Sequence, residues 1–253
     1  MSIILNEYDY AEKSIRDREL GKKPIETINR VAKYYIYSGY SKKEVRELLD
    51  SFLLRCDPNA SVAKWADTLD LAVKNAVKYP LIMIDEIPIT DTEIQRINSV
   101  KSKQAQRLAF TLLCVAKFKH TVRPTNEYWV NTPDNEIMSM ANINTSIKRQ
   151  SMLFGLLKDV GLIQFSKKID NLNVQVLFAD NGDPVVHISD FRNLGYQYLK
   201  HCGEPYFECQ CCGLTLKKST GAGRKQKYCQ SCAAKVKMQQ SVNSVMRIRT
   251  KAS

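Results

Sequence analysis

Long apolar runs are missing from this sequence. No stretch approaches the roughly 20 apolar residues that cross a bilayer as a helix. The first residues carry no basic segment ahead of their short apolar run, as a signal peptide would. We therefore expect a cytoplasmic protein with no membrane partner. In a reducing compartment its eight cysteines are expected to be thiols or metal ligands rather than structural disulfides.

The motifs of several large enzyme classes are also missing. There is no Walker loop, no G-x-G-x-x-G turn and no G-x-S-x-G nucleophile elbow. His187, with Asn193 downstream, resembles the strand histidine and asparagine of HNH nucleases, but the cysteine pairs follow this histidine instead of bracketing it. Such a nuclease also needs metal ligands held against the phosphate. We therefore predict no catalytic residue and no enzymatic activity, and we interpret His187 as a packed strand residue.

Acidic residues are absent from the last part of the chain. From Gly213 to Ser253 there are ten Lys or Arg residues and no Asp or Glu, whereas the preceding 212 residues have 28 basic and 26 acidic ones. The net charge of +12 thus divides into +10 for the tail and +2 for the rest. A basic segment on a nearly neutral body favours nucleic acid as the partner. A solvated tail without a partner is the alternative.

The cysteines beside this segment form two C-x-x-C pairs separated by sixteen residues: Cys209 with Cys212, and Cys229 with Cys232. Each pair can offer two sulfurs to one ion, so the four together predict one tetrahedral Zn²⁺ per chain. Gly213 permits a tight turn after the first pair, and the helix-forming residues 233–238 follow the second. This order is typical of zinc ribbons and treble clefs.

Other uses of the thiols stay open. The two pairs could be disulfides or free thiols, and redox chemistry is disfavoured because a dithiol site normally uses a single pair. His201 could replace one zinc ligand, while Cys202 and Cys211 are spare thiols. The side chain of Cys211, inside the first pair, is expected to point away from the ion.

Residues 1–98 predict a helical N-terminal domain. Helices are expected over residues 24–39, after the capping box formed by Ser41 and Glu44, and between Ser61 and Pro80. The apolar residues 81–89 are expected to be extended, and a second capping box, at residues 90–93, follows them. Nothing in this domain carries recognisable chemistry.

Residues 99–202 predict a winged helix-turn-helix domain, and an unrelated α+β core is the alternative. Helices are expected over residues 101–119, 134–140 and 146–159, followed by strands at 162–165 and 174–178 around a polar loop. The third helix is expected to turn six apolar residues inward: Ile147, Leu153, Phe154, Leu156, Leu157 and Val160. A strand at residues 185–188 and a helix over 189–200 complete this domain.

Residues 203–253 are expected to form the zinc ribbon, treble-clef-like, with a basic helical tail. The predicted fold class is therefore mainly α with small β elements: a helical N-terminal region, a winged helix-turn-helix and a C-terminal zinc ribbon.

Three features together resemble uncharacterised winged-helix and zinc-ribbon proteins of phages and integrated elements of Gram-positive bacteria. They are the stretch of residues 110–117, the helices and hairpin after it, and the cysteine pairs ending in Tyr228-Cys229-x-x-Cys232-Ala233. The resemblance covers residues 85–250 and leaves the N-terminal helices out. It implies a nucleic-acid-associated protein of the bacterial cytoplasm, with a regulatory or replication role and no known reaction.

Double-stranded DNA is the partner that this arrangement favours. The helix that begins at Ser146 would enter the major groove with Ser146, Lys148, Arg149 and Met152 outward. Lys167 and Lys168 in the wing would contact the backbone or the minor groove. Five basic residues of the ribbon and tail would neutralise phosphates: Arg224, Lys225, Lys227, Arg247 and Arg249.

The small net charge of the winged-helix region leaves a second function open. Lys148 and Arg149 could be an ordinary solvated helix face. The protein would then act as an inhibitor or adaptor that binds a host protein, such as a polymerase or an RNA-guided nuclease. In that case its basic tail would compete for an acidic or RNA-lined surface of a protein or ribonucleoprotein.

Overall fold

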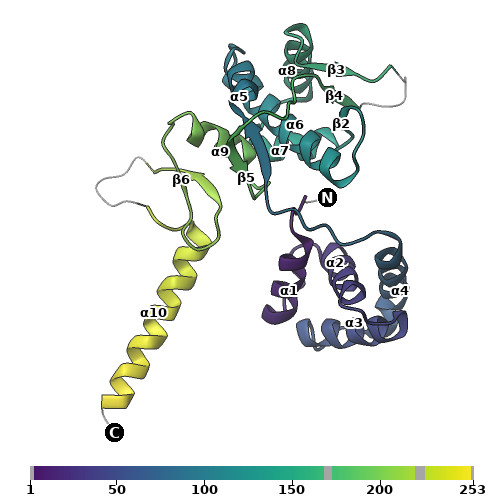
Figure 1. The fold of residues 1–253 in the computed structure, drawn as a ribbon. Coiled ribbons are helices and arrows are strands. Elements are labelled where there is room, and N and C mark those ends of the chain that lie inside the picture. The colour runs from purple at the N-terminus through teal and green to yellow at the C-terminus, as the bar shows by residue number, and fades with distance from the viewer. Residues whose placement is uncertain (1–2, 168–172, 220–225, 252–253) are drawn as a thin grey trace. The chain divides into compact units, whose positions relative to one another are not determined.

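The chain is mainly helical and divides into two compact units, Met1–Glu86 and Ile87–Ser253 (Figure 1). The computed structural model describes residues 3–167, 173–219 and 226–251, and for residues 245–251 the backbone alone. Within these ranges no helix is both long enough and apolar enough to span a bilayer. The division falls before the boundary expected at residue 98, because residues 87–98 pack within the second unit.

The first unit contains four described helices: α1 (Glu7–Asp17), α2 (Pro24–Tyr37), α3 (Lys42–Cys56) and α4 (Val62–Lys78). Helices α2, α3 and α4 follow the sequence prediction, and Ser41 and Glu44 form the expected capping box at the start of α3. Helix α1 was not predicted. Its buried positions are Glu7, Ala11 and Ser14, so it lacks the stripe of large apolar residues that reveals an amphipathic helix.

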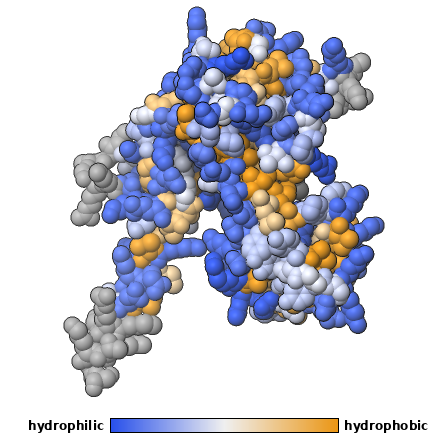
Figure 2. All heavy atoms as spheres, viewed as in Figure 1, coloured by the Kyte–Doolittle hydropathy of each residue, from blue (hydrophilic) through white to orange (hydrophobic). Residues whose placement is uncertain are grey.

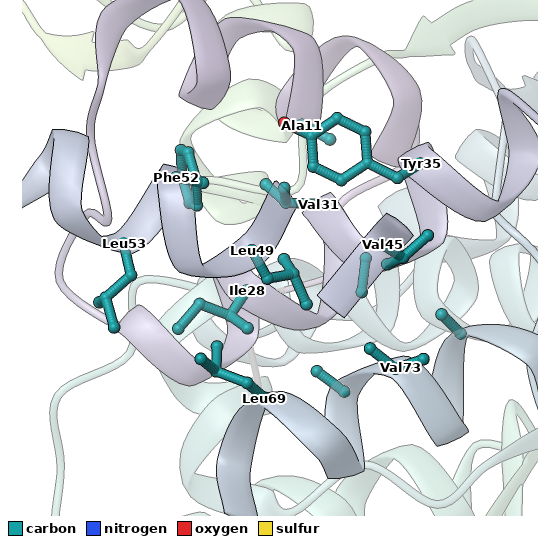
Figure 3. Packing of buried hydrophobic residues seen from close by; sticks show 13 residues of the cluster. Ala11, Ile28, Val31, Tyr35, Val45, Leu49, Phe52, Leu53, Leu69 and Val73 are labelled. Carbon is teal, nitrogen blue, oxygen red and sulfur yellow. The ribbon is translucent and has the colours of Figure 1, made fainter. Parts of the chain in front are cut away.

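Apolar side chains of α2, α3 and α4 meet in the core of the first unit. Ile28, Leu49 and Leu69 lie close together there and are fully buried (Figure 3). A buried carboxylate, that of Glu7, adds hydrogen bonds between elements of this unit. Glu7 accepts a hydrogen bond from the Lys33 ammonium at 2.8 Å and another from the backbone N–H of Ile82 at 3.1 Å. The second contact fixes the extended segment that follows α4 against α1.

Helix α6 (Lys103–Val122) is the centre of the second unit. Its apolar residues are buried nearly all round from Ala105 to Phe118. Against it pack α5 (Asp91–Asn98), α7 (Asp134–Met140), α8 (Ile147–Asp159) and α9 (Leu194–His201).

A three-stranded antiparallel sheet lies beside these helices. The hairpin of β3 (Ile163–Phe165) and β4 (Val174–Val176) was predicted, and Ile163 pairs with Val176. The outer strand, β2 (Tyr128–Val130), was not predicted, because three residues are too few to show an alternating pattern. It pairs with β4, which gives the sheet order β2-β4-β3.

A second, two-stranded sheet joins β1 (Ile87–Thr90) to β5 (Pro184–Ile188). A buried ion pair lies next to it. The Lys117 ammonium of α6 contacts the Glu93 carboxylate of α5 at 2.7 Å and donates to the Pro88 carbonyl at 2.8 Å. The same carboxylate accepts the backbone N–H groups of Thr90 and Asp180, both at 2.8 Å. One fully buried carboxylate thus connects β1, α5, α6 and the segment after β4.

We expect Glu93→Gln to lower the free energy of unfolding of the second unit by about 3–5 kcal/mol, because it leaves a buried ammonium without its counter-charge. Denaturant unfolding measures this change. Lys103→Gln is the control, because it breaks the exposed pair of Lys103 and Glu204 and is expected to cost less than about 1 kcal/mol. Equal costs for the two variants would show that the buried pair has no special role.

Helix α9 packs closely against the turn between α7 and α8. A side chain on Gly195 would meet the Ala141 carbonyl oxygen at 2.0 Å, so only glycine permits this approach. The side-chain amide nitrogen of Asn142 donates to the side-chain oxygen of Asn193 at 2.9 Å. The Arg107 guanidinium donates to the backbone carbonyl of Asn142 at 3.0 Å. Both asparagines have φ of +56°, the left-handed conformation that asparagine tolerates better than most residues.

Three local predictions were wrong. Ile147 and Val160 were expected inward but are 81% and 52% exposed, because each lies at an end of α8 while the buried residues occupy its middle. Helix α9 was expected from residue 189 but begins at Leu194, since Asn193 before it is left-handed. His187, interpreted as a packed residue, lies on β5 opposite Pro88 with an exposed side chain.

Candidate metal centre

A hairpin and a helix position the four predicted cysteines. Strands β6 (Tyr206–Glu208) and β7 (Thr215–Lys217) pair antiparallel and flank the first cysteine pair. Gly213, with φ of +72°, donates its N–H to the Cys209 carbonyl at 2.9 Å and closes the turn there. The second pair lies at the start of α10 (Gln230–Lys251), where Cys229 precedes the helix and Cys232 is in its first turn. This is the order that the sequence predicted.

The four sulfurs form one group. The Sγ atoms of Cys209, Cys212, Cys229 and Cys232 all lie within 4.8 Å of one another, and three of these residues are buried. The sulfurs of Cys212 and Cys229 are 3.9 Å apart. Four sulfurs bound tetrahedrally at about 2.3 Å from a zinc ion would be about 3.8 Å apart. The group therefore can hold one metal ion, and its spacing is compatible with zinc.

Backbone N–H groups prepare this site for negative charge. Burial raises the pKa of the Cys209 thiol, but N–H groups of Cys229, Cys211 and Cys212 outweigh it, and the pKa falls to about 6. The first of these donors lies 3.2 Å from the sulfur. The pKa of Cys232 is raised instead, first by hydrogen bonding with the Cys229 thiol and then by burial. A cation among the sulfurs would stabilise all four thiolates, so metal binding is expected to release protons.

The helix start adds to this preference. The four sulfurs lie at the N-terminus of α10, where the unpaired N–H groups of a helix favour negative charge. The Cys232 N–H points to the Cys229 sulfur at 3.4 Å. Among the described elements, α10 packs extensively against none. The cysteine group is therefore the main attachment of this helix to the body.

Residues outside the hairpin stabilise the turn that carries Cys209 and Cys212, here named the first knuckle. Arg192 donates to the Cys212 carbonyl at 2.6 Å and pairs with Asp190. Asn193 donates to the Thr215 carbonyl at 2.9 Å, and it also contacts Asn142 in the turn before α8. The knuckle and the α7–α8 turn are thus joined through one asparagine. Sequence reasoning missed these supports, because Asn193 was considered only as part of a nuclease motif.

The spare thiols stay outside the group of four. Cys211 and Cys202 are exposed, and neither they nor His201 belong to the cluster found among the described residues. The predicted choice of ligands therefore agrees with the geometry.

The predicted nucleic-acid-binding residues of α8 lie on its surface. Ser146 caps the helix by accepting the N–H of Arg149, and Ser146, Lys148, Arg149 and Met152 are all exposed. Lys167, after β3, and Lys227, before the second cysteine pair, are exposed as well. The others lie at less described positions: Lys168, Arg224 and Lys225 fall outside the described residues, while Arg247 and Arg249 lie on the backbone of α10 with undescribed side chains.

The described surface of α10 is mostly hydrophilic, with a few apolar residues (Figure 2). Met238 is 72% and Val242 40% exposed, four positions apart. Lys235 and Lys237 are exposed beside them. No acidic residue occurs along the helix, so its charge is entirely positive.

Comparison with protein-family models, with curated proteins and with solved structures gives no match to this chain.

Proposed function

We propose that the second unit binds double-stranded DNA, using a winged helix and a zinc-stapled basic helix. The observation that carries the proposal is the charge of the metal-bound segment, which has ten basic residues and no acidic one from Gly213 to Ser253. A helix whose charged residues are all basic, attached to a compact metal centre, suits the phosphate backbone of a duplex.

The ion in this proposal is Zn²⁺. Four thiolates in a closed set are the usual ligands of structural zinc, and a site with no position left for water or substrate serves structure rather than catalysis. The group formed by Cys209, Cys212, Cys229 and Cys232 fits that pattern. Zinc would therefore order α10 and present its basic residues.

The winged-helix assignment is supported by the order of elements. Strand β2 follows the first of the helices α6, α7 and α8, and the β3–β4 hairpin follows the third. A winged helix-turn-helix has its elements in this order. Helix α8 would be the recognition helix, because its N-terminal turn exposes Ser146, Lys148 and Arg149. The exposed Ile147 next to them offers an apolar contact for a thymine methyl group.

The contact through Asn193 supports the use of both surfaces on one duplex. It joins the turn before α8 to the knuckle that holds the start of the basic segment. The biological role that we propose is regulation or replication support in a phage or mobile element of a bacterial cell, and it rests on the sequence resemblance alone.

A second candidate function is an adaptor that binds a host protein. The first unit favours it, because residues 1–86 contain 14 basic and 14 acidic residues and so lack the charge that DNA attracts. Exposed tyrosines on that unit, Tyr37 and Tyr40 among them, are residues that protein interfaces favour.

A mutation pair tests DNA reading. We expect Arg149→Ala to weaken binding to a preferred duplex by about 1–3 kcal/mol and to relax its sequence preference, because this residue would contact base edges. Lys227→Ala, the control on the ribbon, is expected to weaken all duplexes alike. Selection of binding sites from a random pool, followed by titration of each variant, measures both effects.

If selection returns no enriched sequence and Arg149→Ala binds DNA as the unchanged protein does, α8 does not read bases. A stoichiometric complex with a host protein would then favour the adaptor function.

A further inference from the structure

Five tyrosine rings form a continuous row on the first unit. The ring centroids of Tyr37 and Tyr8 are 6.0 Å apart, those of Tyr8 and Tyr34 5.0 Å, those of Tyr34 and Tyr35 5.7 Å, and those of Tyr35 and Tyr40 5.8 Å. These separations are typical of interacting aromatic pairs. The five residues, here named the tyrosine row, come from α1, α2 and the loop before α3.

The tyrosine row is a surface feature. Only Tyr35 is buried, whereas Tyr37 and Tyr40, at the two ends, are 57% and 45% exposed. A row of rings that served only the core would be covered. Tyrosine offers a large rigid apolar face and a hydroxyl, and for that reason it is enriched where proteins meet other proteins.

Carboxylates lie near two members of the row, Tyr8 and Tyr40. Near Tyr8, a hydrogen bond with Tyr34 raises the pKa of the Tyr8 hydroxyl, and the negative charges of Glu12 and Asp9 raise it further. At one end of the row, Tyr40 borders a surface pocket of about 290 Å³ that Glu44 and Glu47 also line.

The carboxylate of Glu44 is held ionised. It accepts the backbone N–H of Ser41 at 2.8 Å, and this hydrogen bond lowers its pKa. Glu47 lies one turn further along α3 and is exposed. The pocket therefore combines the ring of Tyr40 with negative charge, while Leu48 and Ser51 complete its lining.

We propose that the tyrosine row and the pocket beside Tyr40 bind a segment of a second protein that presents lysine or arginine side chains. A cation attracted to a tyrosine face gains further from carboxylates at its edge. A nucleic acid fits this surface poorly, because its phosphates would meet Glu44 and Glu47 on a unit of no net charge. The inference goes beyond DNA binding, since it assigns a protein-binding surface to the other unit.

The test uses the full metal-loaded chain, isotope-labelled for NMR, with hexa-arginine and hexa-lysine peptides as probes. Because the chain carries a net charge of +12, general attraction cannot bring a cationic peptide to it. We expect saturable shifts of the resonances of Tyr40, Glu44 and Glu47 with a cationic peptide, and none with hexa-glutamate.

Matched variants locate the binding. We expect Glu47→Lys to weaken binding of the cationic peptide at least tenfold, and Tyr40→Ala about threefold, as for an exposed cation–π contact. The controls are Asp67→Lys and Tyr79→Ala, which make the same changes at exposed positions on α4 and just after it. Neither control is expected to change the affinity. Far-UV circular dichroism verifies that each variant is folded, and Glu47→Gln replaces Glu47→Lys if the latter is not.

Three results would overturn the proposal. One is the absence of saturable shifts with either cationic peptide. Another is a loss of affinity in Asp67→Lys as large as that in Glu47→Lys. The third is a single-stranded oligonucleotide that shifts the same tyrosine resonances while the peptides do not, which would assign the surface to nucleic acid.

Discussion

Removing the metal ion is expected to melt α10 and to leave the rest of the chain folded. The 22 residues of this helix pack extensively against no other described element, and an isolated helix is marginal in water. Zinc binding by four thiolates contributes about 10 kcal/mol or more to such modules. Protein purified without added zinc should contain one zinc per chain by elemental analysis. Titration with a strong chelator should then remove the α10 contribution from the circular dichroism spectrum.

Two serine variants distinguish the ligands from their neighbour. We expect Cys212→Ser to lose the metal, because its sulfur belongs to the group of four, and Cys211→Ser to retain it, because that thiol is exposed and outside the group. The two residues are adjacent, so a general disturbance of the turn would affect both variants equally. A metal content near zero in the unchanged protein, with a spectrum that a chelator does not alter, would refute the metal centre.

Neutralising the basic residues of α10 is expected to remove much of the affinity for DNA. The variant replaces Lys235, Lys237, Arg247, Arg249 and Lys251 by glutamine, which keeps the helix and all four cysteines. If all five contact phosphates, the slope of log affinity against log salt should fall by about four to five units. Fluorescence anisotropy of a labelled duplex, at several salt concentrations, measures the slope.

The control changes the net charge by the same amount on the other unit, at five exposed lysines: Lys13, Lys22, Lys64, Lys74 and Lys78. We expect its salt slope to equal that of the unchanged protein. If the α10 variant keeps its slope, the phosphate contacts lie on the body instead. If both variants lose the same slope, the net charge of the chain acts as a whole and no particular surface binds.

Features written locally in the sequence were predicted from it. The four cysteine ligands follow from two C-x-x-C pairs, because each pair can fold onto one ion whatever surrounds it. The capping box of Ser41 and Glu44 likewise gave α3 correctly, and the apolar pattern of residues 101–119 gave α6. Each of these signals depends on residues within one or two turns of the chain.

Features that depend on distant parts of the chain were decided by the tertiary structure alone. Strand β2 exists because residues 128–130 pair with β4, which lies more than forty residues further along. The extended residues 87–90 become a strand by pairing with β5, far along the chain. Helix α1 packs on α2 through small and polar residues and the ring of Tyr8, which together show no apolar stripe.

The surfaces on which the proposals rest likewise include some that local sequence patterns predict and some that depend on contacts between distant residues. The sequence by itself determined the metal ligands and the basic tail, since both are patterns of residue type along the chain. The tertiary structure decided that Asn193 joins the knuckle to the turn before α8, and that Tyr8 meets Tyr34 to complete the tyrosine row. Hydrogen bonds and ring contacts between such distant residues leave no periodic trace, because they depend on how helices pack and not on local backbone preference.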